Sequence, residues 1–308
     1  MKIDDNLSAF LADIHVSGKV EGQPTYQNPL FTRAVDRILT LSPRPRRAVI
    51  FGDVALWTGR SADYEASMPD IQRLRDAGID VHLTVGNHDR REQFFRFHPR
   101  QAEITPVPGR AVSVIDLGHA DLVLLDTLDE RPGPEGTSNE VGADFDKAQA
   151  DWLVGAAASA KRPFFIGSHH APFHEPKFTI GGKPLFQALG ENPLLAGFVY
   201  GHDHSWSVTW RGVSWASPRI LKCVCLPSTG WWGTIGFALM KTYPSRAKLS
   251  LELDDFFYPS PPKEGAARPP EWDTVVHETA GAACAFPFGR TGTRAPSRPQ
   301  GLRRRGVG

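Results

Sequence analysis

Five short apolar runs that end in small or polar residues constrain this chain more than any other feature of its sequence. The runs cover residues 8–15, 47–54, 80–89, 162–170 and 196–204. Each run is short and nearly continuously apolar, which predicts a buried strand that leads into a loop. The chain therefore places polar side chains at the end of a strand five times.

Helical patterns lie between these strands, over residues 28–41, 62–78 and 145–160, and Gly78 ends the second of them. Alternating strands and helices predict an α/β layered fold whose ligand site lies at the carboxyl ends of the strands. Residues 111–130 are typical of two paired strands joined near Gly118 and His119, so we expect mixed sheets. Further strands are predicted within 213–227 and 245–258.

The chain has 308 residues, of which 41% are hydrophobic, and can bury a full core. We expect a catalytic domain over residues 1–259. Residues 260–308 form a tail rich in Pro, Gly and Arg, which predicts disorder over most of it, with one short docked segment from Trp272 to Val276.

Composition narrows the classes of function. A formal net charge of +1 disfavours nucleic acid as a partner. The three cysteines offer no disulfide framework and are expected in the core. No apolar run approaches the ~20 residues of a membrane span, and the first residues lack the pattern of a signal peptide, so we expect a cytoplasmic protein. The oligomeric state stays open, with a dimer as one option.

Chance alone does not explain the polar strand ends. About one acid-x-His triplet is expected in a chain of this composition, so Asp13-Ile14-His15 means little by itself. Gly-His-x-His is expected only roughly 0.04 times, yet it occurs at residues 201–204. All five motifs follow predicted strands. Their carboxylate, amide and imidazole groups suit Mn, Fe or Zn, and the lack of thiolates argues against a structural zinc site.

In order and spacing, these motifs resemble those of the calcineurin-like metallophosphoesterases, which carry D-x-H, G-D, G-N-H-D/E, a lone H and G-H-x-H. The resemblance spans roughly residues 8 to 240. It implies a four-layer α/β/β/α sandwich with mixed sheets. Residues 149–153, 168–172 and 226–230 are most similar to the class III cyclic-nucleotide phosphodiesterases.

The resemblance also implies two metal ions, each divalent or trivalent. One would be held by Asp13, His15, Asp53 and His204, and the other by Asp53, Asn87, His169 and His202. Asp53 would bridge the pair, which in two-metal sites lies ~3.5–4 Å apart. His170 competes with His169 as a ligand; we favour His169 and expect His170, together with His174, to lie behind the ligands.

Catalytic roles follow from the same positions. Two cations acidify a shared water, which supplies hydroxide for in-line attack on phosphorus. Asn87 can bind a metal through its oxygen and the phosphoryl group through its amide, and His88 can protonate the leaving group. Asp89 is expected to orient His88.

Several alternatives remain. The predicted activity is hydrolysis of a small phosphodiester, with a phosphomonoesterase, a nucleotide pyrophosphatase or a non-catalytic scaffold as alternatives. Loops 16–28, 131–144 and 173–190 are expected to set specificity. Trp231 and Trp232 are interpreted as core residues rather than a stacking platform for a nucleobase. Asp126 is predicted to cap a strand end, and structural, hydrogen-bonded roles are predicted for His82, His98, His119 and His277.

Overall fold

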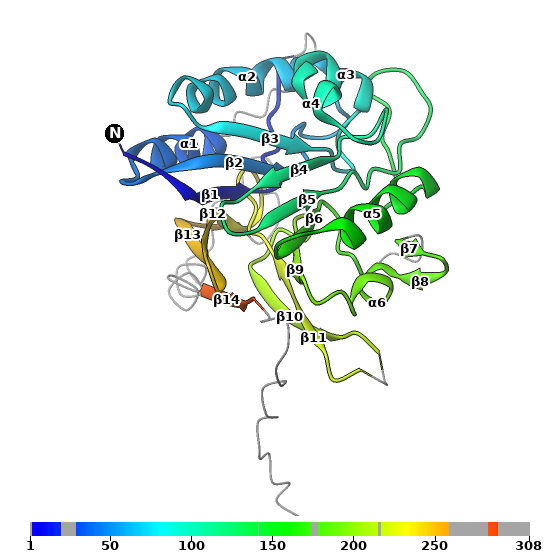
Figure 1. The fold of residues 1–308 in the computed structure, drawn as a ribbon. Coiled ribbons are helices and arrows are strands. Elements are labelled where there is room, and N and C mark those ends of the chain that lie inside the picture. Colours follow the sequence, from blue (N-terminus) through cyan, green and yellow to red (C-terminus); the bar gives the residue numbers. More distant parts are fainter. Residues whose placement is uncertain are drawn as a thin grey trace, which may run out of the picture.

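The computed structural model describes residues 2–19, 29–140, 142–173, 178–214, 217–258 and 283–288. Their strands form two six-stranded sheets and a small two-stranded one. Figure 1 shows the two large sheets in the middle of the molecule, with helices on their outer sides.

The first sheet has the order β14-β13-β12-β1-β2-β3. Its strands β1, β2 and β3 are parallel, whereas β12, β13 and β14 join antiparallel. Their bounds are β1 (Ile3–Leu11), β2 (Arg44–Phe51), β3 (Asp80–Thr84), β12 (Gly233–Tyr243), β13 (Arg246–Tyr258) and β14 (Ala283–Pro287).

The second sheet has the order β10-β11-β9-β6-β5-β4, with four parallel central strands and an antiparallel strand at each edge. Its strands are β4 (Ser113–Asp116), β5 (Asp121–Leu124), β6 (Phe164–Ser168), β9 (Leu195–Tyr200), β10 (Ser207–Gly212) and β11 (Ile220–Cys225). Strands β7 (Thr179–Ile180) and β8 (Lys183–Pro184) form the small sheet. The predicted hairpin near Gly118 is confirmed as β4 and β5.

Three buried clusters define four layers. One fills the space between the large sheets and includes Phe10, Phe51 and Phe165. The second packs α1 and α2 on the first sheet, and the third packs α5 and α6 on the second. The helices are α1 (Leu30–Thr40), α2 (Ser61–Asp76), α3 (Arg91–Phe97), α4 (Pro99–Ile104), α5 (Lys147–Ser159) and α6 (Leu185–Leu189). The predicted α/β/β/α sandwich with mixed sheets is confirmed.

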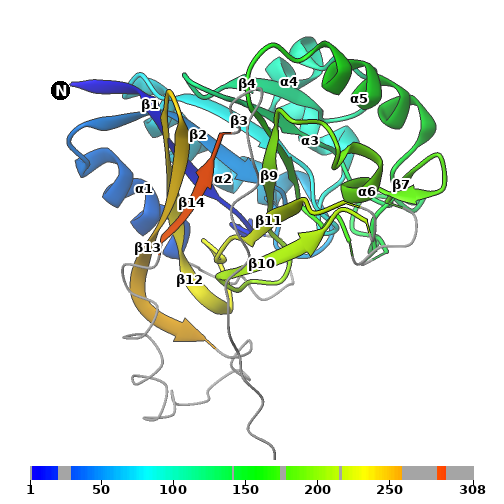
Figure 2. The same ribbon diagram turned by 60° about the horizontal axis from the view of Figure 1, so that its bottom comes forward.

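Strand β14 lies inside the segment predicted as a mostly disordered tail. It pairs with β13 along its length (Figure 2). Cys284 and Phe286 point into the core between the sheets while Ala283 and Ala285 are exposed, so the strand shows the two-residue alternation of a half-buried edge. The expectation of a mostly disordered tail did not include this strand, because five residues of alternation are hidden within a composition typical of disorder. The segment from Trp272 to Val276 lies outside the described residues.

The cysteines and the helix ends agree with the sequence. Cys223, Cys225 and Cys284 are free and buried on strands, as predicted. Gly78 follows α2 with a φ of 78°, a left-handed conformation that glycine adopts without strain. No helix in the described ranges combines the length and apolarity that crossing a membrane requires.

Candidate metal centre

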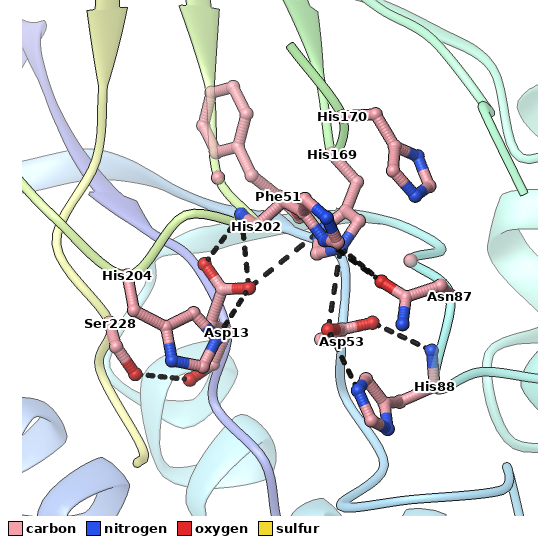
Figure 3. Close-up of polar contacts among 12 residues, drawn as sticks. Asp13, Phe51, Asp53, Asn87, His88, His169, His170, His202, His204 and Ser228 are labelled. Carbon is pink, nitrogen blue, oxygen red and sulfur yellow. Dashed lines mark hydrogen bonds and ion pairs between the residues drawn. The ribbon is translucent and has the colours of Figure 1, made fainter. Parts of the chain in front are cut away.

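Five loops bring their polar side chains together at the carboxyl ends of the strands (Figure 3). Each loop directly follows β1, β2, β3, β6 or β9, the five strands that the sequence indicated. The side chains that meet there are Asp13, His15, Asp53, Asn87, His169, His202 and His204. The parallel strands of both sheets end at this edge, so residues far apart in sequence come into contact.

The first cluster consists of Asp13, His15, Asp53 and His204. All four are buried, and their ligand atoms lie within 4.8 Å of one another. Nε2 of His15 lies 3.1 Å from Nε2 of His204 and 3.7 Å from Oδ2 of Asp53. Nε2 of His204 lies 3.3 Å from Oδ1 of Asp13. Two carboxylates and two imidazoles that converge in this way fit a divalent cation such as Mn, Fe or Zn.

The second cluster consists of Asp53, Asn87, His169 and His202. Nε2 of His169 lies 3.0 Å from Oδ1 of Asn87 and 3.3 Å from Oδ2 of Asp53. Nδ1 of His202 lies 3.0 Å from the same Asn87 oxygen. Asp53 borders both clusters, as a ligand shared by two cations must.

His170 lies at the margin of the second cluster. Its ring centroid is 4.8 Å from that of His169, and these two residues with His202 also form a group able to hold a metal. Nδ1 of His170, however, lies 2.9 Å from the Thr127 hydroxyl, whereas His169 faces Asn87 directly. These contacts favour His169 as the proposed ligand. His174 lies outside the described residues.

Backbone carbonyl groups orient three of the histidines. The nitrogen turned away from the clusters lies 2.9 to 3.3 Å from a carbonyl oxygen; the pairs are His15 with Leu56, His169 with Phe51 and His204 with Trp232. A ring that donates its Nδ1–H to a carbonyl keeps its Nε2 lone pair directed into the cluster, which is the usual arrangement of a metal-binding histidine.

The backbone is strained where these residues lie. Among the described non-glycine residues, positive φ angles occur at Asp13, His15, Asp53, His202 and His204, with values from 43° to 68°. A left-handed conformation costs an L-residue roughly 1–2 kcal/mol, and such strain is typical of functional sites. All five strained residues belong to the two clusters.

Two glycines let the loops approach each other. A Cβ atom on Gly52, whose φ is 87°, would lie 2.8 Å from Nδ1 of His169. A Cβ atom on Gly86 would collide with the carboxylate of Asp53. The Gly-Asp and Gly-Asn-His motifs therefore need glycine for close packing of the loops.

A model of the calcineurin-like phosphoesterases matches residues 8–206 of this chain. The chain belongs to that family. This phosphoesterase is 34% identical over 142 residues to a Rhodopseudomonas palustris protein named as a probable cyclic nucleotide phosphodiesterase. The match covers 46% of this chain and 47% of that protein, so the chain spans about half the length of the curated relative.

Two solved structures support the fold. A dimetal phosphatase from Danio rerio superposes with a TM-score of 0.59 at 17% identity, covering 80% of this chain and 96% of the other. The structure of PhoD superposes with a TM-score of 0.56 at 12% identity, covering 96% and 72%. Both structures are less than 25% identical to this chain, so these similarities show a shared fold.

Burial and the nearby carboxylates shift the pKa values of the phosphoesterase's histidines. Burial lowers the pKa of His15 to about 3 and that of His202 to about 4. Burial acts in the same direction on His169, but the Asp53 and Asp13 carboxylates and the Phe51 carbonyl together outweigh it and raise the pKa to about 9. His15 and His202 thus offer free lone pairs near neutral pH, whereas a cation must displace a proton from His169.

Asp89 anchors two loops instead of orienting His88. The buried carboxylate accepts hydrogen bonds from the hydroxyl of Tyr64 and from the backbone N–H groups of Val54, Ala55 and Gly86, at distances of 2.8 to 3.2 Å. These contacts join the loop after β2, which carries Asp53, to the turn that carries Asn87. The expected contact between Asp89 and the His88 ring is wrong, because both carboxylate oxygens of Asp89 face these other donors.

A carbonyl orients the His88 ring. Nδ1 of His88 lies 3.0 Å from the backbone oxygen of Trp57, and Nε2 lies 3.9 Å from Oδ2 of Asp53. The backbone N–H of His88 also donates to Oδ1 of Asp53 at 2.9 Å. The ring is therefore placed beside the clusters, and the side chain is 22% exposed.

Two residues near the site lie outside the five sequence motifs. The Asn139 side-chain amide donates to the backbone oxygens of Asn87 at 3.2 Å and Asp89 at 2.6 Å, and so ties the loop after β5 to this turn. Trp57 is 53% exposed beside His88. The position of Trp57, four residues after Asp53, could have indicated that it lies near the site. Nothing in the sequence indicates the same for Asn139.

Only some of the structural roles predicted for single Asp and His residues are confirmed. Asp126 is confirmed as a cap, since it accepts from the backbone N–H groups of Ala111 and Leu128. His98 is buried, but neither ring nitrogen has a hydrogen-bond partner among the described residues, so the expected hydrogen bond is absent. The same holds for Nδ1 of His82. His277 lies outside the described residues.

Proposed function

We propose that this phosphoesterase is a dinuclear-metal-dependent phosphodiesterase acting on cyclic nucleotides or other small phosphodiesters. The observation that carries the proposal is the pair of adjacent clusters that both border Asp53. Bound there, two cations would acidify a water molecule and neutralise charge on the phosphate. Manganese, iron and zinc all suit ligands that are oxygen and imidazole nitrogen.

Asn87 and His88 would bind the phosphoryl group and protonate the leaving group. Asn87 has its side-chain oxygen in the second cluster, which leaves its amide NH₂ to donate to a phosphoryl oxygen. His88 donates Nδ1–H to the Trp57 carbonyl and directs Nε2 toward the clusters. Protonated at Nε2, His88 would donate that proton to the leaving oxygen.

Preference for diesters rests on the similarity to the Rhodopseudomonas palustris protein, whose name includes cyclic nucleotide phosphodiesterase. A phosphomonoesterase or a nucleotide pyrophosphatase of the same fold is the second candidate. The cytoplasmic location and the absence of a nucleic-acid partner stay predictions from composition.

The test begins with protein stripped of metal by a chelator and titrated with Mn²⁺, Zn²⁺ or Fe²⁺. Turnover of bis(p-nitrophenyl) phosphate, p-nitrophenyl phosphate and cyclic AMP is measured at each step. We expect activity to rise to a plateau near two equivalents, with faster turnover of the diesters. Metal binding without turnover of any ester would favour a scaffold.

Asp53→Ala tests the shared ligand. Because Asp53 borders both clusters, its loss should abolish turnover and weaken binding of both cations in calorimetry. Asp203→Asn is the matched control, since this exposed carboxylate lies between His202 and His204 but outside both clusters. Full activity of Asp53→Ala would place the chemistry elsewhere.

A further inference from the structure

Trp57 is an exposed aromatic side chain at the margin of the proposed metal centre. It follows β2 by six residues and Asp53 by four, and 53% of its surface is accessible. A single exposed indole is common on protein surfaces. The position of Trp57 is less common, because its ring centroid lies 5.7 Å from that of His88.

Trp231 holds the Trp57 ring in place. The two indoles meet edge to face, with centroids 4.5 Å apart and planes at 85°. Trp231 itself is only 7% exposed and packs against His15 at 4.9 Å. The backbone oxygen of Trp57 is fixed by its contact with Nδ1 of His88. The exposed indole is thus positioned by the same residues that line the proposed metal centre.

The buried member of the pair has an unsatisfied donor. Nε1 of Trp231 has no hydrogen-bond partner in the part of the chain that the structure describes. A buried donor without a partner is costly, and indole N–H groups usually find an acceptor. The Trp231 indole therefore lies beside the proposed metal centre with a donor that the described residues do not satisfy.

We propose that Trp57 and Trp231 form a subsite for a planar aromatic group attached to the phosphate ester, with Trp57 stacking on the ring. The proposal rests on the proposed function, because the metal centre must hold the phosphate next to His88. Two sources of such a ring are a nucleobase, separated from the phosphate by ribose, and an aryl group attached directly. Stacking of one base on an aromatic side chain contributes ~1–3 kcal/mol, or roughly 5- to 150-fold in affinity.

Binding measurements on the Mn²⁺-loaded protein distinguish recognition of the ring from recognition of the phosphate. Calorimetry compares AMP with ribose 5-phosphate, which share the phosphate and sugar, and phenylphosphonate with methylphosphonate, which share the phosphonate. We expect the ligand with the ring to bind about 5- to 150-fold more tightly in at least one pair. A preference in the first pair alone identifies a nucleobase subsite, and a preference in the second identifies an aryl subsite.

Variants test whether Trp57 causes the higher affinity for ligands that carry a ring. Trp57→Ala should reduce the affinity ratio to about one while leaving the affinity for ribose 5-phosphate and methylphosphonate unchanged. Trp57→Phe should keep most of the ratio, because a smaller ring still stacks. Trp210→Ala is the matched control, since Trp210 is 60% exposed on β10, away from the two clusters.

Three results would overturn the subsite. Equal affinities within both pairs in the wild-type protein would show that no ring is recognised. A ratio unchanged in Trp57→Ala would place recognition elsewhere, and a fall in all affinities would mean that Trp57 supports the metal centre instead. If no ligand binds in the presence of Mn²⁺, the proposed function fails together with the subsite, whereas equal binding leaves the metal centre standing.

Discussion

Tyr64→Phe removes one hydroxyl from the buried contact that joins two loops of the site. This hydroxyl donates to Oδ1 of Asp89 at 2.9 Å and accepts from the backbone N–H of Arg90 at 2.9 Å. The Tyr64 ring is fully buried and stacks on Phe97 with centroids 6.0 Å apart, and phenylalanine keeps that packing. The change therefore isolates the two hydrogen bonds.

The expected loss of stability follows from the two hydrogen bonds that Tyr64→Phe removes. A hydrogen bond to a charged carboxylate contributes roughly 1.5–3 kcal/mol, and a buried N–H left without a partner costs roughly 1–3 kcal/mol. Together they predict a loss of roughly 2.5–6 kcal/mol in the free energy of unfolding. Because Asp89 holds the turn that carries Asn87, we also expect roughly 10-fold weaker metal binding.

The dependence on pH sharpens this test. Burial and the nearby Asp53 raise the pKa of Asp89 to about 6, above its usual 3.8. Ionised Asp89 therefore destabilises the fold above pH 6, and the Tyr64 hydroxyl offsets part of that cost. Below pH 6 the carboxyl group becomes protonated in the folded protein, so the difference between wild type and variant should shrink from pH 8 to pH 5.

Urea denaturation in the presence of a chelator measures the stability at both pH values, and calorimetry with Mn²⁺ measures metal affinity. Tyr243→Phe, in the hairpin between β12 and β13, is the matched control and should change neither quantity. If Tyr64→Phe has the stability and metal affinity of the wild type, Asp89 does not anchor the two loops.

Two further predictions concern the core. Burial lowers the pKa of His98 from 6.5 to about 3, so between these values the unfolded chain binds a proton that the folded chain does not, and stability is lost as the pH falls. His98→Leu should remove about 2 kcal/mol of the loss between pH 7.5 and 5, measured by denaturation; an unchanged difference would contradict it. Phe286→Ala should cost roughly 3–5 kcal/mol, because the ring is 1% exposed and packs on Phe165; unchanged stability would mean that β14 adds nothing to the core.

The sequence predicted the strands that carry the site because each is buried and nearly continuously apolar. It missed β12, although this strand lies in the middle of the first sheet. Its run from Gly233 to Tyr243 mixes polar Thr and Lys with apolar residues, and its partner on the other side from β13 is β1, which lies far away in the chain. Pairing over long sequence separation leaves no local pattern.

The proposed ligands could be read from the sequence, since each lies directly after a predicted strand and parallel strands end at one edge. The residues that orient them could not. Leu56 and Phe51 contribute only backbone oxygens to His15 and His169, so no side-chain pattern marks them. Asp89 was assigned to its neighbour His88 because proximity in sequence says nothing about which way a side chain leaves a turn.

The left-handed backbone at Asp13, His15, Asp53, His202 and His204 has a consequence for evolution. Glycine would relieve the backbone at each of these positions, so a chain selected only for thermal tolerance would replace them. Their retention requires a benefit that exceeds the strain. A library screened for heat resistance alone should therefore accumulate glycine or asparagine at these positions in clones that have lost metal binding.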